Sequence, residues 1–325
     1  MTNRSGYSGQ LGVYAGPATP DLAAAVTRQL GVPLGKLGLR RFPDTETHVQ
    51  IEESSRGADI YVIQSTGPSV NENIMELLII LDAFRRASAG RVTAIMPYYG
   101  YSRQEKKSTG REPITARLVA DLLTTAGADR VVSIDLHAPA IQGFFNISMD
   151  HLTAVPIVSE YLEQRKRPDS IVVAPDVGRV KLAAHYAADL RLPVAVLHKE
   201  RILDHGARVH AVIGDVRDRA PIIVDDVIST GGTIAEATRA LLDAGARPEI
   251  TVAATHGLFA GPAFERLSDP AIAEIVVTDT VPLTQTPPGL KVTTLSVASL
   301  LAEAISRLNR EESISALFSP WARAT

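Results

Sequence analysis

The sequence predicts an α/β fold with largely parallel sheets, and three observations support this prediction. Short β-branched runs alternate with longer segments of helical period along most of the chain. Most of the short runs are continuous and mainly apolar, which is typical of strands covered on both faces. Helical segments lie between many of them, as parallel strands require. The predicted strands are 60–63, 91–96, 130–134, 171–174, 193–197, 209–213, 222–224, 250–254 and 274–278.

Local signals mark the ends of two predicted helices. Asn73 and Glu76 resemble a capping pair ahead of apolar residues at helical spacing. Pro113 fits the first turn of a later helix, and Gly127 can close that helix in the left-handed conformation. We therefore expect helix starts close to Asn73 and Pro113.

Length and charge limit the class of protein. The chain has 325 residues, and a length of about 150 residues per domain predicts two domains. Lys and Arg total 33 against 36 Asp and Glu, so the net charge of −3 leaves no basic excess for binding nucleic acid. Apolar residues make up 45% and charged residues 21%, which is typical of a folded globular chain.

The absence of cysteine and of long apolar runs narrows the setting. A chain without cysteine cannot use disulfides, thiolate nucleophiles or cysteine zinc sites, and it fits the reducing cytoplasm that we expect as its location. The densest apolar stretch, 77–81, is far shorter than the roughly 20 residues of a membrane span. Residues 1–20 contain no apolar run of signal-peptide length. We therefore expect neither a membrane partner nor a targeting segment.

An internal repeat predicts two related halves. Segments 60–101 and 222–259 share the order strand, polar loop, helix and strand, with similar lengths. We predict an N-terminal domain over 1–155 and a C-terminal domain over 156–325, with the end of the chain expected to pack back on the N-terminal domain. The alternative is that any two strand–helix–strand units look alike.

The stretch 222–233, IIVDDVISTGGT, carries the chemistry. A strand ends there and a glycine loop opens a helix, and ligands of open α/β sheets bind beyond such strand ends. Gly231 and Gly232 have no Cβ, so backbone N–H groups can approach a phosphate closely. These groups lie at a helix start, where the dipole favours an anion, and Thr230 and Thr233 add hydroxyl donors. The loop is therefore predicted to bind a phosphate.

Two carboxylates, Asp225 and Asp226, precede this loop, where the first half has Ile63 and Gln64. Carboxylates accept hydrogen bonds, which suits vicinal hydroxyls rather than a phosphate. The predicted ligand is therefore a ribose 5-phosphate unit, bound by the second half of the chain. An ordinary glycine turn is the alternative. No Walker A pattern occurs, so a nucleoside triphosphate must be held in another way.

The loop is similar to the phosphoribosyl-diphosphate loop of type I phosphoribosyltransferases, and nearly the whole chain resembles the ribose-phosphate pyrophosphokinase family. The resemblance implies two related phosphoribosyltransferase-like domains, each a mostly parallel sheet flanked by helices. The stretches that carry it are RFPDTE (41–46), SSRG (54–57), NIMELL (73–78), RRASAGRVTA (85–94), YSRQEKK (101–107), DLHAPAIQGFF (135–145), HKER (198–201), IGDV (213–216), VDDVISTGGT (224–233), ATHGLFAGPA (254–263) and ESISALF (312–318).

The resemblance also implies an activity. The family transfers the β,γ-diphosphoryl group of ATP to the anomeric hydroxyl of ribose 5-phosphate, giving phosphoribosyl pyrophosphate and AMP for nucleotide biosynthesis. It implies Mg²⁺ as the cofactor, ATP and ribose 5-phosphate as the partners, and a homo-oligomer, with the hexamer as the family's assembly. The sequence leaves open the oligomer number, the nucleotide donor and the regulation by phosphate and ADP.

Two stretches of the family contact the nucleotide, and they match five residues of this chain: Phe42, Asp44, Glu46, Arg103 and Gln104. The aromatic ring offers a stacking face for adenine, and the acids offer acceptors for its amino group or the ribose. A guanidinium fork suits a triphosphate. A plain surface turn and a solvated charged loop are the alternatives.

Metal and catalytic roles rest on the resemblance as well. His137 and Asp176 match the magnesium positions of the family, although a histidine alone is a weak signal because Mg²⁺ prefers oxygen ligands. Lys199 and Arg201 match its catalytic pair. They open a polar segment that is typical of a mobile lid, and two cations closing over the transferred group would stabilise its developing charge.

The resemblance assigns the sugar phosphate to eight residues: Arg201, Asp225, Asp226, Ser229, Thr230, Gly231, Gly232 and Thr233. Two departures stand out. Ser229 replaces the family's common aspartate, and Val177-Gly178-Arg179 replaces its usual Gly-Gly. Ser54 and Arg56 match a regulatory Ser-x-Arg of the family, a role that transfers less safely than catalysis.

Two other functions remain open from the sequence. A phosphoribosyltransferase would share the 224–233 loop without needing the N-terminal half or the lid cations. A non-catalytic regulatory homologue would assemble with a true synthetase, although the intact HKER stretch and acid pair favour an active enzyme.

Overall fold

The computed structural model describes residues 9–202 and 206–317, without the side chains of 199–202, 206–210 and 316. Within these residues the chain forms two compact units. The first unit holds the described residues up to Thr153, together with Thr280–Pro282 and those from Ser296 onward. The second holds Ala154–Asp279 and Leu283–Leu295.

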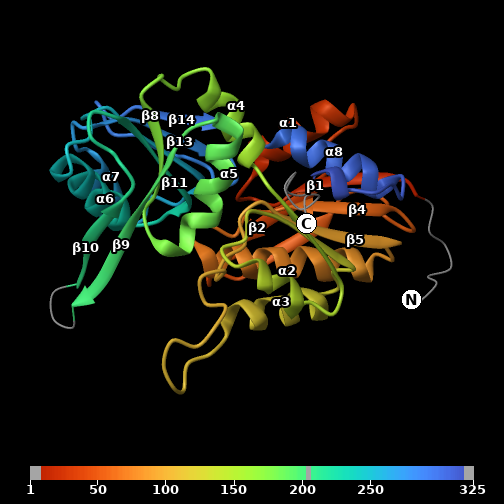
Figure 1. The fold of residues 1–325 in the computed structure, drawn as a ribbon. Helices are drawn as coiled ribbons and strands as arrows, with labels where there is room; N and C mark the ends of the chain where they lie inside the picture. Colours follow the sequence, from red (N-terminus) through yellow and green to blue (C-terminus); the bar gives the residue numbers. More distant parts are fainter. Residues whose placement is uncertain (1–8, 203–205, 318–325) are drawn as a thin grey trace. The chain divides into compact units, whose positions relative to one another are not determined.

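The first unit is built on a parallel five-stranded sheet in the order β1-β4-β5-β6-β7. Helices α1 and α8 lie on one face of this sheet and α2 and α3 on the other (Figure 1). The bounds are β1 (Leu11–Ala15), α1 (Pro20–Leu30), β4 (Asp59–Ile63), α2 (Val70–Arg86), β5 (Arg91–Met96), α3 (Thr115–Ala126), β6 (Arg130–Ile134), the 3₁₀ turn η1 (Pro139–Phe144), β7 (Ser148–Leu152), α8 (Ala298–Asn309) and η3 (Ser315–Leu317).

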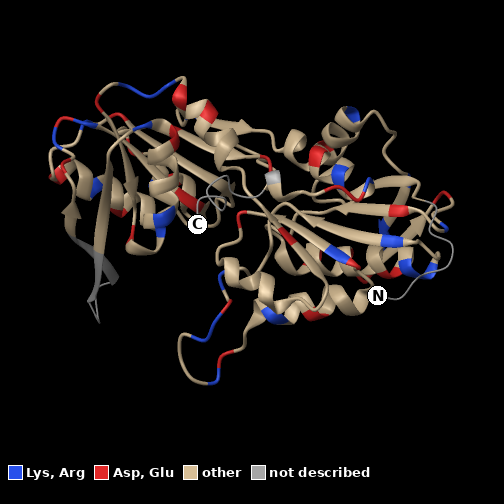
Figure 2. Ribbon diagram, turned by 45° about the vertical axis from the view of Figure 1, so that its right-hand side comes forward, with Lys and Arg blue, Asp and Glu red and all other residues tan. Residues whose placement is uncertain are grey.

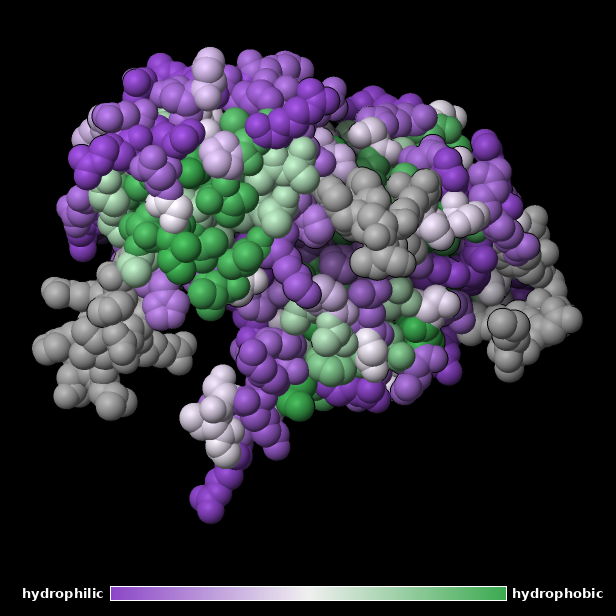
Figure 3. All heavy atoms as spheres, viewed as in Figure 1, coloured by the Kyte–Doolittle hydropathy of each residue, from purple (hydrophilic) through white to green (hydrophobic). Residues whose placement is uncertain are grey.

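Two connections of the first unit extend from this core. The antiparallel pair β2 (Leu37–Arg41) and β3 (Thr47–Ile51) forms a hairpin whose apolar side chains pack on the core. The connection from β5 to α3 protrudes from the unit (Figure 1) and carries several cations along its length (Figure 2). Its tip is hydrophilic (Figure 3). The residues predicted to bind the nucleotide lie on these two connections.

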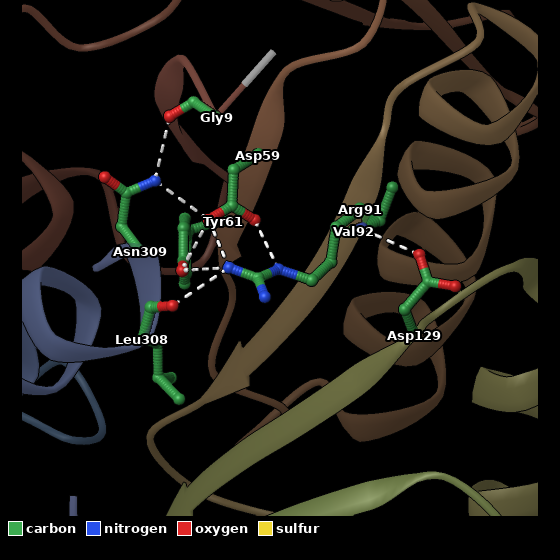
Figure 4. A network of polar contacts seen from close by, with 8 residues as sticks. All are labelled: Gly9, Asp59, Tyr61, Arg91, Val92, Asp129, Leu308 and Asn309. Carbon is green, nitrogen blue, oxygen red and sulfur yellow. Dashed lines mark hydrogen bonds and ion pairs between the residues drawn. The ribbon is translucent and has the colours of Figure 1, made fainter. Parts of the chain in front are cut away.

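The end of α8 is tied to the sheet by a buried ion pair (Figure 4). Asp59 is fully buried and accepts hydrogen bonds from Arg91, Nε to Oδ1 at 2.7 Å and Nη2 to Oδ2 at 2.6 Å. The same Nη2 donates to the carbonyl of Leu308 at 2.9 Å, and Asn309 Nδ2 donates to Asp59 Oδ2 at 2.9 Å and to the carbonyl of Gly9 at 3.1 Å. Charge-assisted contacts therefore connect α8 to β4 and β5.

The second unit is built on a seven-stranded sheet in the order β10-β9-β8-β11-β12-β13-β14. All its neighbouring strands are parallel except β9 and β10, which are antiparallel. The bounds are α4 (Val155–Glu163), β8 (Ser170–Ala174), η2 (Val177–Arg179), α5 (Val180–Leu190), β9 (Val194–Ile202), β10 (Gly206–Ile213), β11 (Ala220–Ile228), α6 (Gly232–Asp243), β12 (Ile250–Gly257), α7 (Ala263–Leu267), β13 (Ile272–Thr278) and β14 (Val292–Leu295).

The predicted α/β class with mostly parallel sheets is confirmed, and each of the nine predicted strands is found. The sequence missed β1, β2, β3, β7 and β14. No helix in the described part of the chain is long and apolar enough to cross a membrane.

The helix ends were predicted less well. The capping role of Asn73 is wrong, because α2 already begins at Val70, and Asn73 Nδ2 instead donates to the carbonyls of Gly67 and Pro68, both at 3.2 Å. The place of Pro113 is also wrong, since α3 begins two residues later at Thr115. The closing role of Gly127 is confirmed: it has φ 115°, and its N–H donates back to the last turn of α3.

Candidate functional site

The candidate site of the second unit lies at the carboxyl end of β11. This strand is paired in parallel with β8 and β12, which places its end beyond the buried middle of the sheet. Asp225 and Asp226 stand there with only 7% and 6% of their surface exposed. Ile223 pairs with Val173 of β8, so Asp176 follows at the same edge of the sheet. Three carboxylates therefore collect where parallel sheets bind ligands.

The loop between β11 and α6 has the geometry of an anion cradle. Gly231 has φ 72°, in the left-handed region, and caps the start of α6. A Cβ at Gly231 would stand 3.2 Å from the carbonyl oxygen of Ala263, so a larger residue would also crowd α7. The first N–H groups of a helix have no partner within it, and the helix dipole draws an anion to them. Thr230 and Thr233 flank these groups.

Helix α7 fixes this loop from one side. Arg266 donates from Nη1 to the carbonyl of Thr230 at 3.1 Å, and its Nη1 lies 3.4 Å from where a Cβ of Gly232 would be. Ser229 accepts a hydrogen bond from the N–H of Ala260 at 2.9 Å through its carbonyl. The sequence did not single out Arg266, because its position beside the loop depends on the packing of α7.

Arg179 bridges the two acids of the site. Its Nε lies 2.9 Å from Asp225 Oδ1 and its Nη2 lies 3.0 Å from Asp226 Oδ1. Burial raises the pKa of the Asp225 carboxyl well above its usual range; the negative charge of Asp226 adds to this rise, and the Arg179 guanidinium opposes it. The sequence had marked Arg179 only as a departure from the family pattern.

The turn that carries Arg179 also holds Asp176. Asp176 Oδ1 accepts a hydrogen bond from the N–H of Gly178 at 2.8 Å, and its carbonyl accepts one from the N–H of Arg179 at 3.2 Å. Asp176 is half-buried, so one carboxylate oxygen helps to fix the turn while the side chain still borders the site. His137 is half-buried in the connection from β6 to η1, in the first unit.

The backbone of the predicted catalytic pair belongs to β9, which continues to Ile202. Arg201 pairs with Ala207 and Lys199 with Val209 of β10, so the segment predicted as a lid forms two arms of an antiparallel ribbon. The side chains of Lys199 and Arg201 lie outside the described part of the structure, as do residues 203–205.

The predicted nucleotide residues of the hairpin are gathered on the turn between β2 and β3. Phe42 is 39% exposed, and the Arg40 guanidinium carbon lies 5.1 Å from the centre of its ring. Asp44 and Glu46 are exposed beside it, and the carbonyl of Glu46 accepts the N–H of Phe42 at 2.9 Å. Arg41 pairs with the buried carboxylate of Glu76 on α2 at 2.7 Å, which anchors the turn.

Arg103 and Gln104 are exposed at the start of the protruding connection, and Thr115 Oγ1 donates to Gln104 Oε1 at 2.6 Å. Ser54 and Arg56 are exposed after β3. The residues predicted to bind the sugar phosphate therefore belong to the second unit, and those predicted to bind the nucleotide belong to the first.

Comparison with known proteins defines the class. A model of the N-terminal domain of ribose phosphate pyrophosphokinase matches residues 11–127, and a model of the phosphoribosyl synthetase-associated domain matches residues 204–319. The chain belongs to the ribose-phosphate pyrophosphokinase family. It is 46% identical over 319 residues to the ribose-phosphate pyrophosphokinase of Bacillus subtilis, covering 98% of this chain and 100% of that protein.

Two further relatives agree over the same length. The ribose-phosphate pyrophosphokinase of Caldanaerobacter subterraneus subsp. tengcongensis is 48% identical over 313 residues, 96% of this chain and 99% of the relative. The crystal structure of phosphoribosylpyrophosphate synthetase from Mycobacterium smegmatis matches with a TM-score of 0.86 and 44% identity, covering 93% of this chain and 99% of that one. The likeness thus includes both units.

Proposed function

We propose that this protein is a ribose-phosphate diphosphokinase. It transfers the β,γ-diphosphoryl group of ATP to the anomeric hydroxyl of ribose 5-phosphate, and it releases phosphoribosyl pyrophosphate and AMP for nucleotide biosynthesis. One observation carries this proposal: a buried acid pair directly precedes a glycine cradle at a helix start, in a chain similar to named synthetases over nearly its whole length.

The sugar phosphate is held at both ends. The phosphate lies on the N–H groups at the start of α6, with the hydroxyls of Ser229, Thr230 and Thr233 as further donors. Asp225 and Asp226 accept hydrogen bonds from the vicinal hydroxyls of the ribose. Fixing both ends leaves the anomeric hydroxyl as the group that reacts, which supplies the orientation that a two-substrate transfer needs.

The nucleotide is bound by the first unit. Phe42 stacks on the adenine, Asp44 and Glu46 accept from its amino group or the ribose, and Arg103 pairs with the phosphates beside Gln104. Lys199 and Arg201, which match the catalytic pair of the family, stabilise charge on the non-bridging oxygens of the transferred group, and Arg201 also binds the sugar phosphate. Closure of the lid predicted for this stretch keeps water from the reacting phosphorus.

The donor set fits Mg²⁺ in part. Asp176 offers a carboxylate, which is the ligand that this ion prefers, whereas His137 offers a nitrogen. The described residues contain no group of three or more His, Cys, Asp or Glu that could hold a metal by themselves. At either residue, phosphate oxygens and water would therefore supply the remaining ligands of the ion. When bound, Mg²⁺ neutralises charge on the phosphates of the nucleotide.

A single assay tests the proposed function. Purified protein is incubated with ATP, Mg²⁺ and ribose 5-phosphate, and phosphoribosyl pyrophosphate and AMP are quantified. We expect the two products in equal amounts. Absence of both products would overturn the proposal. Pyrophosphate release that depends on an added base would identify a phosphoribosyltransferase, and an inactive protein that changes the rate of an active synthetase would identify a regulatory homologue.

The assembly proposed is a homo-oligomer, with a hexamer as the expected number. Large apolar side chains are exposed at helical spacing on α3, where Leu118 is 53% and Leu122 is 39% exposed, and on α2, where Met75 is 55% exposed. Exposed apolar side chains grouped in this way favour an interface. Light scattering of the purified protein measures the number. Regulation through Ser54 and Arg56 and a cytoplasmic location stay predictions.

A further inference from the structure

The acid pair at the end of β11 is already held by a cation from its own chain. Arg179 spans the two carboxylates and reaches each through its Oδ1 atom, at 2.9 Å for Asp225 and 3.0 Å for Asp226. The arginine side chain is 17% exposed and the two acid side chains are 9% and 8% exposed. A contact this far from solvent is weakly screened, unlike a surface ion pair.

Arg179 contacts the same atom, Oδ1, in each of the two acids. Asp225 Oδ1 also accepts the N–H of Asp226 at 2.8 Å, so it already serves two donors. One planar guanidinium thus fixes both carboxylates at once. Two acceptors held at a fixed spacing suit two neighbouring hydroxyls of one sugar.

The backbone around Arg179 makes the arrangement rigid. Arg179 ends the 3₁₀ turn η2 and precedes α5, and its N–H donates to the carbonyl of Asp176 at 3.2 Å. Asp176 Oδ1 in turn accepts the N–H of Gly178 at 2.8 Å. A planar guanidinium on a fixed turn can bridge two carboxylates, whereas a lysine ammonium offers a single charged point on a flexible stem.

We propose that Arg179 is a positioning residue for the sugar: its guanidinium bridges Asp225 and Asp226 and presents them together as fixed acceptors for two vicinal hydroxyls. This inference rests on the proposed function, because it concerns the same ribose 5-phosphate site. This gives Arg179 a role in specificity that the acid pair alone does not have, because both hydroxyls contribute to binding only when both carboxylates are aligned with them. A sugar phosphate that lacks one of the hydroxyls should therefore bind much less well.

Three variants test the inference. Arg179→Ala removes the bridge, and Arg179→Lys keeps the charge but not the fork. Arg247→Ala is the matched control, because it removes an arginine that pairs with Asp169 at 3.0 Å in the same unit. Binding of ribose 5-phosphate and of 2-deoxyribose 5-phosphate is measured by calorimetry without nucleotide, and KM and kcat are measured with ATP and Mg²⁺.

We expect Arg179→Ala to weaken ribose 5-phosphate binding roughly tenfold or more, with KM for ATP changed less than about twofold. Arg179→Lys should lie between this variant and the wild type. The preference for ribose over 2-deoxyribose 5-phosphate should fall in both variants, and added guanidinium ion at millimolar concentration should restore part of the affinity of Arg179→Ala. Arg247→Ala should behave as the wild type.

Unchanged sugar affinity in the Arg179 variants of an active enzyme would overturn the inference and leave the proposed function intact. An equal loss for both sugars, or KM for ATP rising together with KM for the sugar, would show a structural role only and would also overturn it. If Arg179→Ala fails to fold, as judged by circular dichroism, the lysine variant decides. A wild type that neither binds ribose 5-phosphate nor turns it over would remove the proposed function, and the inference with it.

Discussion

Two connections of the molecule occupy the same place in their strand–helix–strand units and differ in what fills them. One joins β4 to α2 in the first unit, and the other joins β11 to α6 in the second. Each follows a strand that is paired in parallel with the next strand of its unit. The sequence repeat predicted this correspondence, with Gln64 of the first unit standing where the second has Asp226.

The connection of the first unit is filled by its own side chains. Gln64 is fully buried; its Oε1 accepts the N–H of Ala18 at 3.0 Å and its Nε2 donates to the carbonyl of Asn73 at 3.3 Å. Thr66 Oγ1 donates to the carbonyl of Tyr98 at 2.9 Å and accepts the N–H of Gly100 at 2.7 Å. The side chains of Gln64 and Thr66 are therefore used in contacts inside the protein.

The connection of the second unit keeps its polar groups at the edge of the sheet. Its acids are held by Arg179 through one oxygen each, and its glycine turn leads directly into the start of α6. The comparison teaches that one backbone arrangement can carry two different sets of polar groups. Under the proposed function, binding depends on these side chains rather than on the shared backbone arrangement.

The largest effect is expected when the two acids of the second connection are replaced by uncharged side chains, as in the connection of the first unit. The double variant Asp225→Asn, Asp226→Asn should lower kcat/KM for ribose 5-phosphate roughly 100- to 1000-fold, because two carboxylate acceptors for the hydroxyls are lost. This factor corresponds to a loss of about 3 to 4 kcal/mol in the binding of the transition state. Steady-state kinetics measure this. KM for ATP should stay nearly constant, and a sugar KM equal to that of the wild type would contradict the assignment.

A smaller effect should follow from a methyl group in the phosphate cradle. Gly231→Ala places a Cβ on a residue with φ 72° and 3.2 Å from the carbonyl oxygen of Ala263. The left-handed backbone then costs roughly 1 to 2 kcal/mol, and we expect ribose 5-phosphate to bind about tenfold more weakly. Calorimetry measures the affinity.

The matched control for this variant lies in the first unit. In Gly67→Ala the new Cβ would stand 3.0 Å from Val281 Cγ1, so a side chain must shift, but no predicted ligand group is near. Its sugar affinity should equal that of the wild type. An equal loss in both variants would mean that the cradle has no special role.

The next effect is on stability rather than on binding. Gln64→Ala leaves the N–H of Ala18 without its acceptor in a partly buried site, and we expect a loss of about 1 to 2 kcal/mol in the free energy of unfolding. Urea unfolding followed by circular dichroism measures this loss, while kcat and both KM values should remain close to wild type. A fall in sugar affinity without a loss of stability would show that the first connection also binds a ligand.

The parts of the fold that the sequence predicted well are those with continuous burial. Strands β5 and β6 were predicted with the observed bounds, because each is a mainly apolar run that is buried after its first residue. The missed hairpin of β2 and β3 is at most half-buried and carries charges, so its pattern does not stand out from a loop. β9 was predicted to end at Leu197 but continues to Ile202, because pairing with β10 extends it into polar residues.

The site could be predicted only as far as its residues are close in sequence. The acids and the glycine loop form one stretch, so their shared role followed from residue types and spacing. Arg179 and Arg266 reach the same stretch from η2 and α7, and such contacts depend on strand order and helix packing. The supposed cap at Asn73 failed for a related reason, since its side chain bonds to the preceding turn instead of starting the helix.

The smallest expected effect is on the pH dependence of stability, where the two connections should differ because Gln64 does not titrate. Burial raises the pKa of the Asp225 carboxyl above its ordinary 3.8, so between that value and the raised pKa the folded state binds more protons than the unfolded state. The contribution of Asp225 to the free energy of unfolding should therefore fall as the pH rises through this window.

Asp225→Asn removes that contribution. The stability of the variant minus that of the wild type should rise with pH across the window, by less than about 1.4 kcal/mol per pH unit because only one proton is involved. Asp243→Asn, the same change on an exposed residue of α6, is the control for the substitution itself. A flat difference for Asp225→Asn would mean that Arg179 cancels the effect of burial on the Asp225 carboxyl, which would sharpen the contrast with the neutral connection of the first unit.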